Sequence, residues 1–296
     1  MKFQLHKQAL PKLLLCVFAM SSLWGCTTMG VSQSSTPAQL SSESIARIVA
    51  SPDRSDADRT NDLRRKPVQM LSFIKLRPGM VALDLSAGGG YTSELLARAV
   101  GPTGVVYGQS PPPPSATGRP IRPPAAPEGN SSPQLSAPAV LPSATPPVRR
   151  SSAQALAERA KNPDLRHLQS VARPFEDPVP PELSGKLDLV TLMFNYHDLG
   201  HLEVDRKRMN AAVFAGLKPK GMYVIADHAG RPGTGISESG TLHRIEEAFL
   251  RKEVEAAGFV LVEQGDFLRN PGDPRDQNTP VPAQPKDEFV LKFMKP

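Results

Sequence analysis

The chain has 296 residues, of which 39% are hydrophobic and 5% aromatic, enough apolar material for one sizeable domain with appendages. Its 32 prolines are spread unevenly, and its formal net charge is +6. Three lysines in residues 1–26 carry half of this charge, and the proline-rich segment 111–150 carries the other half. The rest of the chain is neutral overall, so the sequence argues against a nucleic-acid partner, which would need a basic surface.

Residues 1–26 have the pattern of an export signal. The three lysines precede an apolar segment, residues 13–23, that is shorter than a standard membrane span. It ends in Leu23-Trp24-Gly25-Cys26, which resembles a bacterial lipoprotein box, and the resemblance implies a lipid on Cys26. We expect an exported, periplasmic protein anchored to the envelope through Cys26. Thr27 favours the outer membrane, because inner-membrane retention usually requires aspartate at that place. An ordinary cleaved signal and an uncleaved anchor are the alternatives.

Composition divides the remaining chain. Apart from Cys26, the only cysteine is Cys16 in the apolar part of the signal, so the domain has no disulfide, thiolate metal site or cysteine nucleophile. Residues 27–42 are rich in Ser and Thr and predict a flexible tether. Residues 111–150 are proline-rich without an apolar period, which predicts a disordered insertion in a surface loop. We interpret this insertion as a spacer, with a partner-binding segment as the alternative. The domain itself is expected to span residues 43–296 around it.

The domain is predicted to begin with helices over residues 43–75, interrupted by a polar stretch, with Pro67 opening the last helix. Charged residues of this part form either a solvated face or a lid over the pocket that follows. They are Arg54, Arg59, Asp62, Arg64 and Arg65.

A strand, a glycine turn and a helix follow over residues 81–100. Glycine lets the backbone turn tightly and approach a ligand, and the helix start offers unpaired N–H groups. Asp84, at the end of the strand, can accept hydrogen bonds from a ligand or from the loop. The spacing Asp84-x-Ser86-x-Gly88-x-Gly90 resembles the first motif of class I S-adenosylmethionine-dependent methyltransferases, D/E-x-G-x-G-x-G, with serine replacing the first glycine. The alternative is a tight strand-to-helix turn of any α/β protein.

Strands and helices alternate through the rest of the chain. Strands are predicted at residues 105–109, 168–175, 187–194, 222–226, 259–263 and 288–293, and helices at 152–161, 209–217 and 242–257. This alternation indicates a doubly wound α/β domain, in which ligands bind outside the carboxyl ends of the strands. The rule brings polar side chains to one rim: Asp84 to Tyr91, Gln109, Asn195 to Asp198, Asp227 and His228.

Over about residues 45–110 and 151–296 the chain resembles predicted class I methyltransferases found as exported bacterial proteins. The segments that carry this resemblance are Arg64–Pro67, Arg77–Met80, Leu83–Thr92, Phe194–Leu199, Ala226–His228, His243–Glu246, Glu255–Phe259 and Asn270–Asp273. The resemblance implies a Rossmann-like, seven-stranded, mostly parallel sheet with helices on both faces and an antiparallel last strand. It also implies S-adenosyl-L-methionine as cofactor and a small-molecule acceptor that the sequence does not name. The oligomeric state is not indicated.

The same resemblance assigns roles along the rim. The implied cofactor-binding residues are Asp84, Ser86, Gly88, Gly89, Gly90, Tyr91, Gln109, Asn195 and Tyr196. Gln109 stands where an acidic residue usually binds the ribose hydroxyls, and its amide can both donate and accept. We expect His197 as the catalytic base, oriented by Asp198 or Asp227, with His228 as the second candidate. A hydrogen-bonded structural histidine is the alternative at each position.

Two other functions stay open. A non-catalytic small-molecule-binding or envelope interaction protein could use the same fold. Metal-dependent hydrolysis would draw on the polar residues at the ends of the fourth and fifth strands. These are His197, Asp198, His201, Asp227 and His228. Gly200 weakens a helix there, and the glutamate of H-E-x-x-H is missing, so we rank this function last and expect no metal site.

Overall fold

The computed structural model describes residues 38–112, 151–280 and 282–296. The expected signal with Cys26, most of the tether, and the proline-rich insertion after Pro112 lie outside the described residues. Within the described ranges, no helix has the length and apolar character that a membrane crossing requires.

Seven strands form one sheet in the order β3-β2-β1-β4-β5-β7-β6. The strands are β1 (Val81–Leu85), β2 (Val105–Ser110), β3 (Leu168–Ala172), β4 (Leu187–Met193), β5 (Leu217–His228), β6 (Val260–Gly265) and β7 (Glu288–Met294). β7 pairs antiparallel with both β5 and β6, and all other pairs are parallel. This confirms the expected sheet with an antiparallel last strand. Because β1 and β4 are neighbours although β2 follows β1 in the chain, the sheet has its switch point between them.

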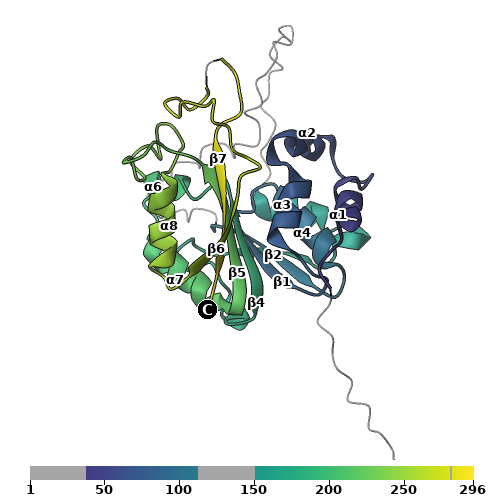
Figure 1. The fold of residues 1–296 in the computed structure, drawn as a ribbon. Coiled ribbons are helices and arrows are strands. Elements are labelled where there is room, and N and C mark those ends of the chain that lie inside the picture. The colour runs from purple at the N-terminus through teal and green to yellow at the C-terminus, as the bar shows by residue number, and fades with distance from the viewer. Residues whose placement is uncertain (1–37, 113–150, 281) are drawn as a thin grey trace, which may run out of the picture. The chain divides into compact units, whose positions relative to one another are not determined.

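Helices cover both faces of the sheet (Figure 1). On one side lie α1 (Ser42–Val49), α2 (Asp56–Arg65), α3 (Pro67–Ile74), α4 (Tyr91–Val100) and α5 (Ser152–Arg159). On the other lie α6 (Asp198–His201), α7 (Arg206–Gly216) and α8 (Glu247–Glu255). Two short 3-10 helices, η1 (Pro163–Leu165) and η2 (Pro181–Leu183), complete the connections. The predicted helices before and after the polar stretch agree with α1 and α3, whereas α2 forms largely within that polar stretch.

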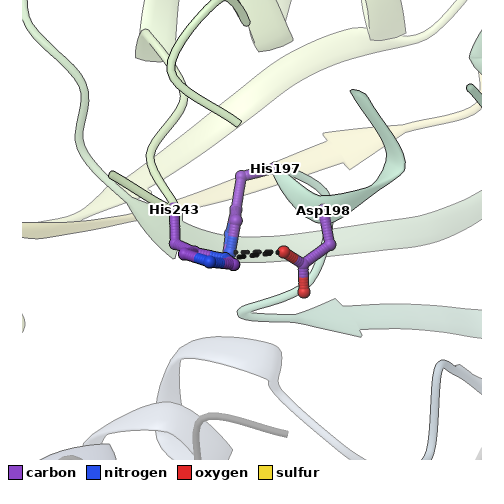
Figure 2. A group of neighbouring side chains, drawn as sticks. All are labelled: His197, Asp198 and His243. Atoms are coloured by element: carbon purple, nitrogen blue, oxygen red, sulfur yellow. Dashed lines mark hydrogen bonds and ion pairs between the residues drawn. The ribbon is translucent and has the colours of Figure 1, made fainter. Parts of the chain in front are cut away.

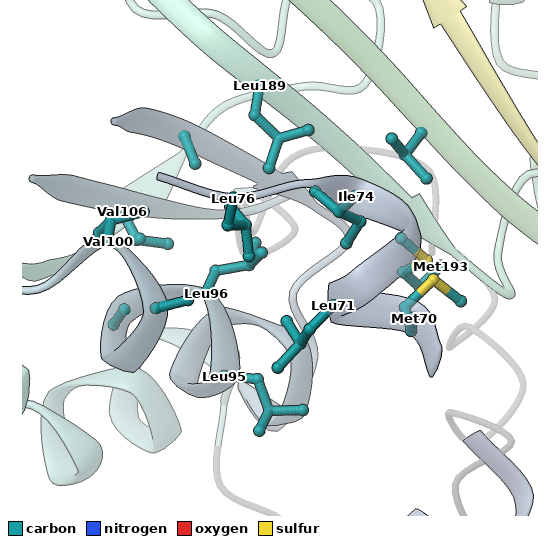
Figure 3. Close-up of a cluster of buried hydrophobic side chains, with 14 of the residues drawn as sticks. Met70, Leu71, Ile74, Leu76, Leu95, Leu96, Val100, Val106, Leu189 and Met193 are labelled. Atoms are coloured by element: carbon teal, nitrogen blue, oxygen red, sulfur yellow. The ribbon is translucent and has the colours of Figure 1, made fainter. Parts of the chain in front are cut away.

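The core consists of two buried clusters, one on each face of the sheet. Figure 3 shows the first, where Leu71 of α3 and Leu96 of α4 pack with Leu189 of β4. In β1, Ala82 belongs to this cluster, whereas Leu83 belongs to the opposite one. The strand therefore buries side chains on both faces, which explains its nearly continuous apolar sequence.

Two predicted elements differ from the structure. The helix expected over 242–257 begins only at Glu247, because Ile245 forms an isolated β-bridge with Ala229 and His243 adopts a positive φ of 52°. The fifth strand is longer than expected and includes residues 218–221, which were predicted as a turn. There the register against β4 shifts, so the expected turn is a bulge within the strand.

Candidate functional site

The glycine turn connects β1 to α4 and depends on left-handed backbone conformations. Ser86, Gly88 and Gly90 have φ values of 55°, 53° and 81°. A Cβ on Gly90 would lie 2.9 Å from side-chain atoms of Leu156 and Arg159, so only glycine fits there. By contrast, a Cβ on Gly89 would meet nothing within 4 Å. The outer side of the turn therefore has room for a ligand close to the backbone.

Asp84 sits beneath this turn, and its carboxylate is used inside the protein. One oxygen accepts from the Ser93 hydroxyl at 2.6 Å and the other from the Thr191 hydroxyl at 2.8 Å. Burial raises the pKa of Asp84 to about 6, against the hydrogen bonds from Ser93 and Thr191, which lower it. Asp84 therefore joins β1 to α4 and β4, and its side chain does not point out of the rim.

Gln109 is also committed to internal contacts. Its Oε1 accepts from the backbone N–H of Ser86 at 3.0 Å, and its Nε2 donates to the carbonyl of Arg173 at 2.6 Å. The side chain is fully buried. Gln109 holds the glycine turn against the segment after β3, and its burial keeps the amide away from a ligand at the rim.

The end of α2 lies over the turn, as the lid interpretation of its charges requires. The hydroxyl of Tyr91, the first residue of α4, donates to Asp62 at 2.7 Å. The Arg65 guanidinium lies over the rings of Tyr91 and Phe194, with 5.1 and 4.8 Å to the centroids. Burial and the neighbouring Arg64 lower the pKa of Arg65 to about 10, and its Nε has no hydrogen-bond partner among the described residues. Arg65 thus places a half-buried cation beside the glycine turn.

The segment after β4 separates two residues that were expected to act together. Asn195 reaches the rim: its Oδ1 accepts from the Ser86 hydroxyl at 2.6 Å, and its Nδ2 donates to Asp198 at 2.8 Å. Tyr196 points into the core between sheet and helices, where its hydroxyl meets Glu253 at 2.9 Å. The side chain of Tyr196 therefore lies away from the expected cofactor contact.

His197 is clamped by carboxylates at the ends of two strands. Its Nδ1 lies 2.6 Å from Asp227 Oδ1, and its backbone N–H donates to Asp227 Oδ2 at 2.7 Å. Its Nε2 lies 3.2 Å from Asp198 Oδ1. Burial alone would depress the pKa of His197, but Asp227 and Asp198 outweigh it and raise the pKa to about 10. His197 therefore keeps its proton at neutral pH in this arrangement, which does not suit the predicted base.

Asp198 is the meeting point of the cluster, and Figure 2 shows His197 and His243 turned toward its carboxylate. The Nδ1 of His243 lies 3.0 Å from Asp198 Oδ1, and the Nδ1 of His201 lies 3.8 Å from it. Burial would raise the pKa of Asp198, but His197 and His243 hold it well below its ordinary value. His243 was not predicted as a site residue. The only sequence signal for it was its place in the resembling segment His243–Glu246, and it lies in a loop instead of the expected helix.

His228, the second predicted catalytic residue, belongs to a neighbouring set. Its Nδ1 lies 3.0 Å from Glu288 Oε1, and Arg64 donates to the same oxygen at 2.6 Å. Burial would raise the pKa of Glu288, but His228 and Arg64 lower it. The His228 ring packs against the His197 ring at a tilt of 42°, with 5.2 Å between centroids, so the two sets of side chains are neighbours.

A separate cavity of about 540 Å³ lies between the end of β5, the start of α8 and the loop after β6. Its arginines are paired: Arg269 with Glu247 and Asp287, and Arg275 with Asp287. It contains none of the residues predicted for the rim. The glycine turn and the histidines at the rim offer more groups that can bind or orient a ligand than this cavity does.

No protein-family model matches the chain, and no curated protein matches it in sequence. Solved structures do match it. An S-adenosylmethionine-dependent methyltransferase from Aquifex aeolicus has a TM-score of 0.50 and 16% identity, covering 82% of this chain and 100% of its own. Geranyl diphosphate C-methyltransferase from Streptomyces coelicolor, solved with Mg2+, geranyl diphosphate and S-adenosyl-L-homocysteine, has a TM-score of 0.50 and 12% identity, covering 85% and 87%. At these identities the likeness defines the fold, which is that of class I methyltransferases.

Proposed function

We propose that this chain is an S-adenosylmethionine-dependent methyltransferase that acts on a small-molecule acceptor. The observation that carries the proposal is the hydrogen bond from Ser86 to Asn195, which joins the glycine turn to the end of β4. It puts a turn suited to a nucleotide-type ligand beside the titratable cluster around Asp198, at the switch point of the sheet. Turn and cluster together offer places for a cofactor and for an acceptor on a class I methyltransferase fold.

The residues at the turn fit S-adenosylmethionine in two respects. The bare backbone at Gly88 and Gly89 leaves room for close approach, since the nearest atom to a Cβ on Gly88 is 3.8 Å away. The half-buried guanidinium of Arg65, whose Nε has no partner among the described residues, suits the carboxylate of the methionine part. When bound, the cofactor supplies a methyl group on a sulfonium. Asp84 and Gln109 shape the turn, because the contacts described above already satisfy their polar atoms.

The residues after β4 and β5 serve the acceptor side. Asp198 stays ionised, and its partner His243 has 14% of its side chain exposed, so the cluster opens toward solvent there. His197, fixed between Asp227 and Asp198, positions that carboxylate. These groups orient an acceptor, and orientation is the main protein contribution to an in-line methyl transfer.

We also propose that the protein works in the cell envelope, exported by residues 1–26 and held by a lipid on Cys26. The support is the sequence alone: a basic start, a short apolar segment and a cysteine at its end.

Calorimetric titration of the full-length protein in detergent with S-adenosylmethionine and S-adenosylhomocysteine tests the function. We expect micromolar binding of both. Arg65→Met should weaken it by about tenfold to a hundredfold, because one charge-assisted contact is lost. Arg59→Met, on the same helix, is the matched control and should bind as the wild type does, since Arg59 contacts the Ser51 carbonyl instead. A folded protein that binds neither ligand would exclude the methyltransferase and leave the non-catalytic binding protein.

A further inference from the structure

Two imidazole nitrogens converge on a single oxygen of Asp198, and a third lies nearby. The Nδ1 of His243, the Nε2 of His197 and the Nδ1 of His201 lie 3.0, 3.2 and 3.8 Å from Oδ1. The other oxygen of Asp198 is already taken by Asn195 at 2.8 Å. The Nδ1 of His201 also contacts the Ser239 hydroxyl at 3.1 Å, so the nitrogens of His243 and His197 are the two that face Oδ1 directly. The arrangement has the composition of a ligand set for a cation.

The nitrogen of His197 that faces this cluster has no hydrogen bond. His197 is fully buried, and its Nε2 makes no bond of acceptable geometry to any described residue despite lying 3.2 Å from Asp198. Its Nδ1 is held by Asp227 at 2.6 Å. A histidine that donates one ring N–H to a carboxylate and turns its other nitrogen to a shared centre has the arrangement usual for a metal ligand.

The separations also suit a metal ion. The candidate ligand atoms of His197, Asp198 and His243 all lie within 4.8 Å of one another. Bonds of about 2.0–2.1 Å in tetrahedral geometry place ligand atoms about 3.4 Å apart. The observed 3.0 and 3.2 Å need only a small opening. Two imidazoles and one carboxylate favour zinc or another divalent transition metal over calcium or magnesium, which prefer oxygen.

We propose that His197, Asp198 and His243 bind a divalent transition-metal ion, with a fourth position on the side of His201. His201 has 22% of its side chain exposed, so that side is open to solvent and to a coordinating small molecule. Asp227 holds His197 in the required orientation through Nδ1, and the ion takes the place of the proton on Nε2. The ligands come from two segments, the turn after β4 and the loop before α8, so the ion would join them. The site does not depend on methyl transfer, and it revises the expectation of no metal from the sequence.

The test uses full-length protein in detergent, stripped with a chelator and then titrated with Zn2+ against a chromophoric chelator. We expect one tight site per chain. His243→Ala should weaken binding by about a hundredfold or more, since one of three ligands is lost. His167→Ala is the matched control, because the His167 ring contacts the Ala97 carbonyl of α4 and should leave binding unchanged.

Substitution with Co2+ gives a second readout. Visible ligand-field bands of a nitrogen- and oxygen-bound ion should appear in the wild type and be lost in His243→Ala and in Asp198→Asn. Equal Zn2+ affinity in wild type and His243→Ala, or absence of tight binding by the folded wild type, would overturn the site. Both measurements are made without S-adenosylmethionine, so their outcome is separate from that of the cofactor titration.

Discussion

At the scale of single residues, Asp84 shows that a residue of a ligand-binding motif can serve to hold the fold together. The spacing of the glycine motif points to a ligand contact, but the structure gives both carboxylate oxygens to hydroxyls, of Ser93 on α4 and Thr191 on β4. Its position at 2% exposure makes the charge costly, which is why burial raises its pKa to about 6. Asp84 sets the distance between the first strand and the helix that carries the turn.

Asp84→Asn should therefore change how stability depends on pH. Between the ordinary pKa of 3.8 and the folded value of about 6, the folded wild type binds more protons than the unfolded chain, so this group lowers stability as pH rises through that window. The full effect is about 3 kcal/mol, from roughly two pKa units. The asparagine variant lacks it and can keep both hydroxyl partners. Urea unfolding from pH 4 to pH 7 should show the variant gaining relative stability; parallel curves would contradict the prediction.

The sequence was sufficient for some site residues and insufficient for others. Glycine at positions 88 and 90 signals positive φ directly, and both were found there. The direction of a side chain after a strand is not encoded locally: Asn195 reaches the rim, whereas the adjacent Tyr196 enters the core. His243 joined the cluster because the chain around it is pinned by the bridge of Ile245 to Ala229, a contact between distant segments that no spacing reveals.

At the scale of elements, the start of α4 is held by α2 and α5. Arg159 at the end of α5 donates to the Gly89 carbonyl at 2.7 Å and to Asp58 of α2 at 2.7 Å, and it also contacts Glu94 of α4. Both carboxylates have side chains only 6% exposed. One guanidinium thus joins three helices around the turn, and its loss leaves buried charge behind.

Arg159→Met should destabilise the domain by about 3 kcal/mol, because breaking a buried pair leaves Asp58 and Glu94 without their shared cation. Lys161→Met is the matched control. It removes an ion pair with Glu158 whose side chains are 72% and 53% exposed, and it should cost less than about 0.5 kcal/mol. Chemical unfolding of the two variants measures both effects. Similar losses would show that Arg159 acts as an ordinary surface charge.

The helices and strands begin where the local sequence pattern predicts only if tertiary packing favours the same boundary. β7 and α3 begin where their apolar runs and Pro67 predict. The periodic stretch 242–246 is not helical, because Arg244 is fully buried and donates to the Ala229 carbonyl and to Gln277. The β-bridge of Ile245 to Ala229 also fixes an extended backbone there, and these contacts outweigh the helical propensity of the segment.

At the scale of the whole molecule, the alternation of strands and helices was enough to predict a doubly wound sheet. The direction of β7 came from the resemblance, since no local pattern sets it, and the structure confirmed the mixed sheet with its antiparallel last strand. The order of the strands was not predicted and comes from the structure. The expected signal segment, which lies outside the described residues, leads to a separate prediction. That prediction depends on Cys26 and not on the fold.

Cys26→Ser should release the protein from the membrane fraction of a Gram-negative host. Each buried methylene of an acyl chain contributes about 0.8 kcal/mol, so one chain binds marginally and several hold firmly, whereas a protein without acyl chains has only its signal segment. Labelled palmitate should enter the wild type and be lost in the variant. Cys16→Ser, in the apolar part of the signal, is the matched control and should keep the label. A membrane-bound but unlabelled wild type would show an uncleaved anchor, and a soluble one an ordinary cleaved signal.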